Sequence, residues 1–368
     1  MTPVDHAARR ARLAATLDEA GLGALLVTAL VNVRYLSGFT GSNAALLVAR
    51  ETAGQGVLAT DGRYVTQAGA QSADLDLVID RACARALVAW AGEHGLRRLG
   101  IEAQAVTLAD LDVLSKAARE APGLELVTLD APVEALRAVK DDAELVLIAA
   151  ACEIGDHALG ELWETVALGR TERDLAHELE HRMFVHGAEA PGFATIVAGG
   201  PHSAIPHHRP TDRPLERGDL LKIDFGARVG GYHADMTRTV VVGAPASPWQ
   251  QEIHELVAAA QRAGRDALAP GTAAVDVDAA ARAVIEQGGH GPDFPHGLGH
   301  GVGLQIHEAP MIGPTADGKL VCRMPVTVEP GVYLPGRGGV RIEDTLIVGD
   351  GGPQLLTTTT RELLVLGT

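Results

Sequence analysis

Apolar residues in the first third of the chain follow two different periods. Short continuous apolar runs alternate with longer stretches in which apolar residues recur every three or four positions. Short runs are typical of buried strands, and the longer period is typical of amphipathic helices. This alternation predicts a small α/β domain. The predicted strands cover residues 24–28, 43–49, 57–60, 99–101 and 124–129, and the predicted helices cover residues 6–20, 82–93 and 108–119.

A turn-forming pair interrupts this pattern at Asp130 and Pro132, just before a long helical stretch. Proline restricts the backbone on both sides, so such a segment is a favourable place for one domain to end. We therefore predict an N-terminal α/β domain over residues 1–133 and a C-terminal domain over residues 134–368. A helix over residues 141–167 is expected near the start of the second domain.

The second domain contains a weak internal repeat. Gly169 and Thr171 precede one amphipathic helix, and Gly271 and Thr272 precede another; each helix is followed by a loop and then by a pair of apolar strands. Both threonines are predicted to cap their helices with a side-chain oxygen. A duplication of this kind predicts an α+β domain with pseudo-twofold symmetry, in which each half contributes acidic residues from a strand pair.

The first of these strand pairs contains a strong hairpin signal, the two-residue turn Gly230-Gly231. Counting outward from the turn places Asp224 opposite Thr237. Asp235 lies two residues from Thr237 and therefore on the same face as Asp224. Diagonal neighbours of this kind are about 7–8 Å apart at the backbone, so both carboxylates are expected to reach one ion.

Two buried carboxylates this close need a cation, a shared proton or a basic partner. A solvated face or pairing with Arg238 would explain them without a metal. Later segments favour a metal. Residues 295–308 contain three histidines and four glycines, and imidazole is the commonest metal-binding side chain. Glu329 and Glu343 each interrupt a β-branched run, where an uncompensated charge is expensive.

Taken in order, these residues resemble the ligand set of the pita-bread (M24) metallopeptidases, which include methionine aminopeptidase, aminopeptidase P and prolidase. The resemblance extends over residues 134–348 and implies that two divalent ions bind to five side chains, the second and fifth of which bridge the ions. Because every ligand type is retained, metal-free relatives such as creatine amidinohydrolase fit less well. Four carboxylates favour Mn²⁺, although Co²⁺ or Zn²⁺ could bind. The five residues are Asp224, Asp235, His300, Glu329 and Glu343.

The same resemblance implies roles for further residues. A hydroxide that bridges the two ions would attack the scissile carbonyl, and Glu329 would transfer its proton. His207 and His307 match histidines that bind the substrate and stabilise the tetrahedral intermediate. His296 matches a histidine that lines the substrate site. Glu329, His207 and His307 are therefore the predicted catalytic residues.

Two other side chains are candidates for supporting the site. Arg341 is predicted to bind substrate or to orient the bridging carboxylates, and Tyr333 is a candidate for the same orienting role. Simple packing explains both of them equally well. His208 matches no residue of the family and is predicted to lie at the surface.

The N-terminal domain bears on the choice of substrate. Residues 35–42 and 60–64 resemble the bacterial aminopeptidase P group. The main prediction is therefore an Xaa-Pro aminopeptidase, which releases the first residue from peptides with proline in second position. The alternative is an Xaa-Pro dipeptidase, or prolidase, and an inactive peptide- or protein-binding module is a third reading. The resemblance also implies a homodimer.

Composition excludes several other kinds of protein. The chain has 368 residues, 46% of them hydrophobic, and a formal net charge of −16, and its 31 basic residues form no long block, so nucleic acid is not an expected partner. The three cysteines lack CxxC spacing, which predicts free thiols. No apolar run reaches the roughly 18–20 residues that cross a bilayer. With no secretory signal apparent, we expect a cytoplasmic protein without a membrane partner.

Overall fold

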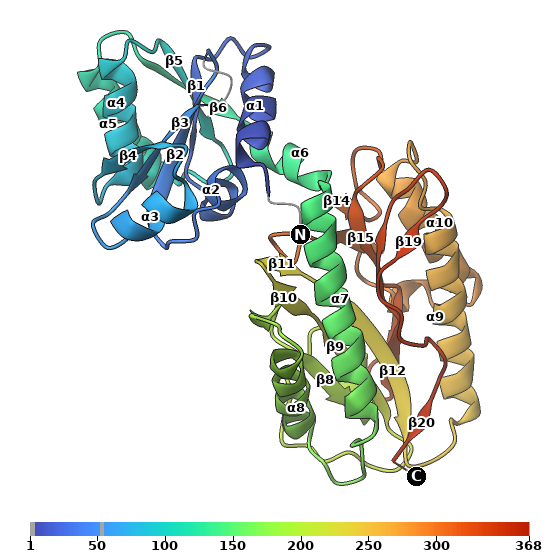
Figure 1. The fold of residues 1–368 in the computed structure, drawn as a ribbon. Coiled ribbons are helices and arrows are strands. Elements are labelled where there is room, and N and C mark those ends of the chain that lie inside the picture. The colour runs from blue at the N-terminus through green and yellow to red at the C-terminus, as the bar shows by residue number, and fades with distance from the viewer. Residues whose placement is uncertain (1–3, 52–54, 368) are drawn as a thin grey trace. The chain divides into compact units, whose positions relative to one another are not determined.

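The computed structural model describes residues 4–51 and 55–367. The chain forms two compact units, residues 1–137 and 138–368 (Figure 1). The division falls within helix α6 (Pro132–Ala138), the same helix that contains the predicted boundary between residues 133 and 134.

A mixed six-stranded sheet forms the centre of the first unit. Its strands are β1 (Ala24–Val27), β2 (Ala44–Ala49), β3 (Gly56–Thr60), β4 (Asp76–Ile79), β5 (Arg98–Glu102) and β6 (Glu125–Leu129). They lie in the order β4-β3-β2-β1-β5-β6. The apolar runs at the centre are buried, as a sheet covered on both faces requires. The five predicted strands are therefore confirmed.

Helices surround this sheet. They are α1 (His6–Leu17), α2 (Leu30–Ser37), α3 (Val65–Gln71), α4 (Cys83–Glu93) and α5 (Leu108–Glu120). The three helices predicted for this unit are present. The sequence analysis missed α2, α3 and β4, because they are short and the edge strand β4 is largely exposed.

The second unit consists of two similar halves, each with a pair of helices and an antiparallel core of strands. The helices are α7 (Asp142–Trp163) and α8 (Glu172–Val185) in the first half, and α9 (Pro248–Asp266) and α10 (Ala274–Gln287) in the second. Helix α7 begins where it was predicted and ends at Trp163, before residue 167. No helix in the described part of the chain is long and apolar enough to cross a membrane.

The strands of the second unit form two larger sheets and two small ones. The first half contains β7 (Ala190–Pro191), β8 (Ile196–Gly199), β9 (Leu220–Phe225), β10 (Ala227–Val229), β11 (Tyr232–His233) and β12 (Met236–Val242). The later strands are β13 (Gly299–Gly301), β14 (Glu308–Ile312), β15 (Pro325–Val328), β16 (Gly331–Leu334), β17 (Gly338–Arg341), β18 (Asp344–Ile347), β19 (Gln354–Leu355) and β20 (Val365–Leu366). The larger sheets have the orders β20-β12-β9-β8 and β14-β13-β15-β18-β19. Two short 3₁₀ helices are also present, η1 (Gly200–Ala204) and η2 (Gly291–Asp293).

Matching hydrogen bonds before α8 and α10 support the predicted repeat. The amide of Gly169 donates to the carbonyl of Leu215 at 2.9 Å, and the amide of Gly271 donates to the carbonyl of Leu320 at 2.7 Å. Both glycines have positive φ angles, 82° and 88°, a conformation that side chains disfavour. The same local turn therefore precedes the second helix of each half.

The helix caps distinguish the two halves. Thr171 caps α8 through a reciprocal capping box with Asp174, as predicted. Helix α10 begins three residues after Gly271, just as α8 begins three residues after Gly169, so Ala273 and not Thr272 occupies the cap position and forms no side-chain hydrogen bond there. The predicted cap at Thr272 is therefore wrong.

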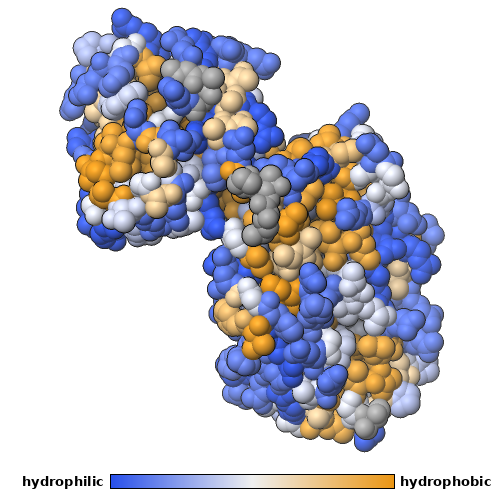
Figure 2. Space-filling view, viewed as in Figure 1, coloured by the Kyte–Doolittle hydropathy of each residue, from blue (hydrophilic) through white to orange (hydrophobic). Residues whose placement is uncertain are grey.

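Aliphatic side chains fill the core of the second half. Val257 and Ala260 lie three residues apart on α9, and Val277 and Ala281 lie four apart on α10, so each pair shares one helix face. These residues belong to the same buried cluster as Val326 of β15. On the face of the molecule in Figure 2, hydrophilic residues predominate and hydrophobic ones gather in separate groups.

The predicted hairpin turn fixes the register beside the candidate ligands. Gly230 and Gly231 have φ angles of 56° and 84°, the conformation of a two-residue hairpin turn with two positive φ angles. As predicted, Asp224 pairs with Thr237 between β9 and β12. The turn thus sets the pairing of β9 with β12. This pairing determines which side chains of the two strands face the interior.

Gly226 lies at the closest approach of the two hairpin arms, where an added Cβ atom would overlap the carbonyl oxygen of Ala234. We expect Gly226→Ala to lower the free energy of unfolding by about 1–3 kcal/mol, because the strand that leads to Asp235 must move. In Gly160→Ala, on α7, the added Cβ meets nothing within 4 Å, so this variant should gain about 0.5–1 kcal/mol. Urea unfolding measures both changes, and equal stability of the two variants would contradict the prediction.

Candidate metal centre

A cavity of ≈ 940 Å³ opens into the second unit. Histidine, acidic and apolar side chains line it together. The lining includes all five predicted metal ligands, Asp224, Asp235, His300, Glu329 and Glu343. Side chains that are more than 100 residues apart in the sequence therefore meet at one site.

Each of the five ligands lies on a strand or directly next to one. Asp235 directly precedes β12. Asp224 lies on β9 and His300 on β13. Glu329 directly follows β15, and its amide donates to the carbonyl of Leu298 at 2.8 Å. Glu343 directly precedes β18. Because paired strands deform little, they hold ligands more firmly than loops do.

Three of these side chains converge closely. Nε2 of His300 lies 3.5 Å from a carboxylate oxygen of Asp235 and 3.4 Å from one of Glu329. One ligand atom from each of Asp235, His300 and Glu343 lies within 4.8 Å of the others. This spacing suits nitrogen and oxygen ligands that share a cation at about 2.0–2.2 Å.

Without a cation, the buried carboxylates of the site repel one another. Burial raises the pKa of Asp235 well above its ordinary value, and repulsion from Glu343 and Asp224 raises it further. Burial and repulsion from Glu329 also raise the pKa of Glu343. Burial would raise the pKa of Glu329 as well, but the hydrogen bond and positive charge of His300 outweigh it and lower that pKa to about 2.

Unpaired carboxylate oxygens show that the residues fit divalent ions. Oδ1 of Asp224 and Oδ1 of Asp235 are buried and have no hydrogen-bond partner. Carboxylate oxygens are strong acceptors, and a buried acceptor without a partner costs about 1–3 kcal/mol. A divalent cation would satisfy both oxygens and relieve the repulsion between the carboxylates. The ligand set, four carboxylates and one imidazole, is one that hard or borderline cations accept.

Arg341 is the basic partner of Asp224. Its guanidinium is fully enclosed, forms an ion pair with Asp224, and donates to the hydroxyl of Tyr333 at 2.7 Å and to Oγ1 of Thr237 at 3.0 Å. Burial raises the pKa of Tyr333 to about 12, so its hydroxyl stays protonated. Arg238, the partner considered from sequence, bonds elsewhere.

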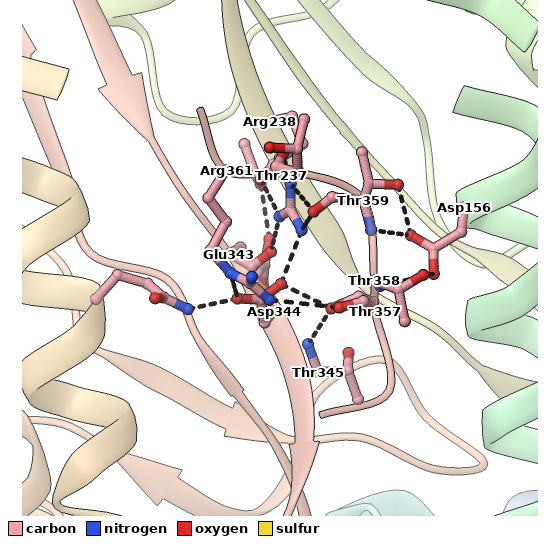
Figure 3. A network of polar contacts seen from close by, with 12 residues as sticks. Asp156, Thr237, Arg238, Glu343, Asp344, Thr345, Thr357, Thr358, Thr359 and Arg361 are labelled. Atoms are coloured by element: carbon pink, nitrogen blue, oxygen red, sulfur yellow. Dashed lines mark hydrogen bonds and ion pairs between the residues drawn. The ribbon is translucent and has the colours of Figure 1, made fainter. Parts of the chain in front are cut away.

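Arg238 belongs to a buried polar network behind the ligands (Figure 3). It donates to Asp344 at 2.8 Å and to the main-chain carbonyl of Glu343. Asp344 also accepts hydrogen bonds from Gln261, Thr357 and Arg361. The network fixes the backbone from which Glu343 projects. The sequence analysis missed it, because its members are spread over more than a hundred residues.

Three other predicted histidines also line the cavity. The rings of His300 and His307 meet edge to face, with their centroids 4.4 Å apart. Nε2 of His296 lies 2.9 Å from the hydroxyl of Tyr333. Burial lowers the pKa of His296 and of His307, and the neighbouring His300 lowers that of His307 further. His207, His296 and His307 thus line the same cavity as the candidate ligands.

His208 is not at the surface, which corrects the prediction made for it. It is buried, and its Nε2 lies 2.9 Å from a carboxylate oxygen of Glu172. Glu172, the first residue of α8, is fully buried and was missed in the sequence analysis. An acidic residue in the first turn of a helix is ordinarily explained by the helix dipole, so its sequence position gave no sign of this contact.

Comparison with known proteins identifies the family. A model of metallopeptidase family M24 matches residues 146–350, and a model of the creatinase/prolidase N-terminal domain matches residues 9–139. The chain belongs to metallopeptidase family M24. The predicted pita-bread fold with its additional N-terminal domain is thereby confirmed, and the protein is an enzyme, a hydrolase of the metallopeptidase class.

Individual M24 proteins resemble the chain closely. An Xaa-Pro dipeptidase from Pyrococcus horikoshii is 41% identical over 271 residues, which cover 74% of this chain and 76% of the relative. The structure of an Xaa-Pro dipeptidase from Bacillus anthracis superposes with a TM-score of 0.91 at 36% identity and covers 98% of this chain and 100% of that one. An X-Pro aminopeptidase structure from Thermotoga maritima has a TM-score of 0.88 at 34% identity, with coverage of 97% and 99%.

The raised pKa values predict that metal binding releases protons. In the metal-free protein, Asp235 and Glu343 keep their protons above the ordinary carboxyl range near pH ~4, and ligation requires their ionised forms. Metal affinity should therefore rise with pH. Calorimetric titration with Mn²⁺ in two buffers of different ionisation enthalpy should show release of about one proton or more. Identical heats in the two buffers would contradict the prediction.

Proposed function

We propose that this M24 metallopeptidase is an Xaa-Pro dipeptidase, which hydrolyses dipeptides with proline in second position. The observation that carries this proposal is the likeness to the Bacillus anthracis dipeptidase, because it extends over 98% of this chain and all of that one. It therefore includes the N-terminal unit. The relative from Pyrococcus horikoshii bears the same name.

This proposal replaces the main prediction, Xaa-Pro aminopeptidase, with the alternative. The aminopeptidase reading rested on two short motifs of the N-terminal domain, residues 35–42 and 60–64. In the structure these motifs belong to the first unit, whereas the metal centre and its cavity lie in the second. Because the chain also resembles the Thermotoga maritima X-Pro aminopeptidase, an Xaa-Pro-Yaa tripeptide serves as the comparison substrate in the assay.

The site is proposed to hold two divalent metal ions, with Mn²⁺ favoured by the carboxylate-rich ligand set. Asp235 and Glu343 would bridge the ions, and Asp224, His300 and Glu329 would complete the ligand set. When bound, such ions polarise a substrate carbonyl and acidify water. The two unpaired carboxylate oxygens of Asp224 and Asp235 support this assignment.

The chain's own side chains then have distinct tasks. Glu329 is ionised, because its pKa is lowered to about 2, and it can accept a proton and pass it to the leaving amine. His207 and His307 can bind the substrate carbonyl and stabilise the charge that develops on its oxygen. His296 lines the same cavity. Arg341 donates to Asp224, Thr237 and Tyr333, so we assign it to orienting ligands.

The cavity also contains features that suit a proline dipeptide. The bond before proline has no N–H, so the site must recognise the ring and the charged ends of the substrate. Phe193, Ile306 and Met311 supply apolar lining for the pyrrolidine ring. Arg209 is exposed and lines the same cavity, which supports a role for its guanidinium in binding the proline carboxylate.

The proposal is tested with chelator-treated protein reconstituted with Mn²⁺ and assayed on an Xaa-Pro dipeptide and an Xaa-Pro-Yaa tripeptide. Cleavage of the dipeptide alone is expected. Asp235→Ala and Glu343→Ala should each lose bound metal and lower kcat/KM by at least about a thousandfold, since both remove a bridging ligand. Wild-type turnover in either variant would sink the metal assignment, and tripeptide cleavage would restore the aminopeptidase reading.

Substitution of Arg209 tests the dipeptide preference directly. We expect Arg209→Met to raise KM for the dipeptide about tenfold or more with little change in kcat, because a charge-assisted pair with the substrate carboxylate contributes about 1.5–3 kcal/mol. Amidation of the dipeptide's carboxylate should abolish this difference. Arg262→Met, at an exposed position on α9, is the matched control. An unchanged KM would exclude Arg209 as the carboxylate-binding residue.

The third reading of the sequence, an inactive binding module, is not supported, because the chain belongs to metallopeptidase family M24 and is a hydrolase. A homodimer and a cytoplasmic location stay predictions from the sequence. Peptides with proline in second position are the proposed partners, and the net charge of −16 gives no support for nucleic acid as another.

A further inference from the structure

A second buried cluster lies beside the metal centre, around the carboxylate of Glu172. One oxygen accepts hydrogen bonds from the amide of Gly199 and from Nδ1 of His202, both at 2.8 Å. The other oxygen accepts from Nε2 of His208 at 2.9 Å and from the amide and hydroxyl of Thr211 at 2.9 and 2.7 Å. One carboxylate thus fixes both ends of a single segment, residues 199–211.

The same segment is anchored on its inner side. Nζ of Lys222 donates to the carbonyl of Ile205 at 2.7 Å, and Arg341 donates to the carbonyl of Pro206 at 3.3 Å. Arg341 also holds Asp224, so the segment and the metal centre share a partner. The residue that follows these anchored carbonyls is His207.

His207 is itself exposed and lines the cavity. Its own burial therefore does not fix the imidazole, and the residues on either side must do so. Pro206 is held by Arg341, and His208 is held by Glu172. We propose that Glu172 is a positioning residue, which holds the segment 199–211 so that His207 faces the substrate. This inference rests on the proposed peptidase function.

Only a carboxylate meets the demands of this position. A carboxylate accepts hydrogen bonds at both oxygens, whereas an amide has one oxygen and an NH₂ group that would face other N–H donors. Burial would raise the pKa of Glu172, but the hydrogen bonds from Gly199, His208 and Thr211 outweigh it and lower that pKa to about 2. The group therefore stays ionised and can only accept hydrogen bonds, so both histidines act as donors to it.

A third metal ion is the rival explanation, because ligand atoms of Glu172, His202 and His208 lie within 4.8 Å of one another. Both oxygens of Glu172 already accept at least two hydrogen bonds, and main-chain amides supply two of these. An ion would displace these donors and leave buried N–H groups without partners. The cluster is thus complete as a hydrogen-bonded clamp.

The experiment compares Glu172→Gln with Glu178→Gln in the Mn²⁺-reconstituted full chain. Glu178 lies on the same helix and pairs with Arg170 and Arg182, away from the segment 199–211. Glu172→Gln should lower kcat about 10- to 100-fold while two ions stay bound, because a displaced catalytic group of this kind costs about that much. Glu178→Gln should lower the melting temperature yet keep kcat within about twofold.

Two further readouts separate positioning from simple loss of stability. Amide hydrogen exchange in a peptide that spans residues 199–211 should speed up about tenfold or more in Glu172→Gln and stay unchanged in Glu178→Gln. The double variant with His207→Ala should be no slower than His207→Ala alone, since residues that act through one group are not additive.

Several results would overturn the proposal. One is a kcat of the double variant that falls by the product of the two single losses. Another is unchanged amide hydrogen exchange over residues 199–211 in Glu172→Gln. The third is a third metal ion that the wild type binds and Glu172→Gln loses. If the wild type cleaves no proline peptide, the proposed function fails, but the exchange and metal measurements still decide whether Glu172 holds the segment.

Discussion

Repulsion among four buried carboxylates is the constraint on which the rest of this site depends. Asp224 is neutralised by the guanidinium of Arg341, and Glu329 is held ionised by His300. Asp235 shares His300 with Glu329, and Glu343 accepts a hydrogen bond from the neutral hydroxyl of Thr237. Burial and repulsion from neighbouring carboxylates raise the pKa of both Asp235 and Glu343. Basic side chains thus pair with Asp224 and Glu329. The carboxylates of Asp235 and Glu343 need cations to balance their charge.

A site with this much stored repulsion needs a rigid frame. Strands from both halves of the second unit supply this frame. Buried polar groups form hydrogen bonds that hold these strands and the neighbouring segments in place. Arg238 and Asp344 fix the backbone next to Glu343, and Glu172 fixes the segment next to His207. These groups contact main-chain atoms and neighbouring side chains instead of the metal-ligating atoms, yet they determine where ligands and substrate-facing histidines lie. Two duplicated halves, each incomplete alone, meet to form one catalytic centre.

Local sequence signals predicted much of this arrangement. The turn at Gly230 and Gly231 set the register that brings Asp224 and Asp235 to one face, because side chains alternate along a strand. The positions of His208 and Glu172 could not be predicted in this way. Their contact joins the start of a helix to a loop 36 residues later in the sequence, and only the packing of the whole unit brings them together.

The buried network around Asp344 has a consequence for how the enzyme matures. Three of its partners, Thr357, Arg361 and the carbonyl of Thr359 bound by Arg238, come from a short segment after the last ligand. While that segment is still inside the ribosome, Asp344 and Arg238 lack partners that they have in the folded chain. All five ligands are then already synthesised, but their frame is incomplete. Completion of the frame around the metal centre therefore depends on residues 357–361, which follow the last ligand in the sequence.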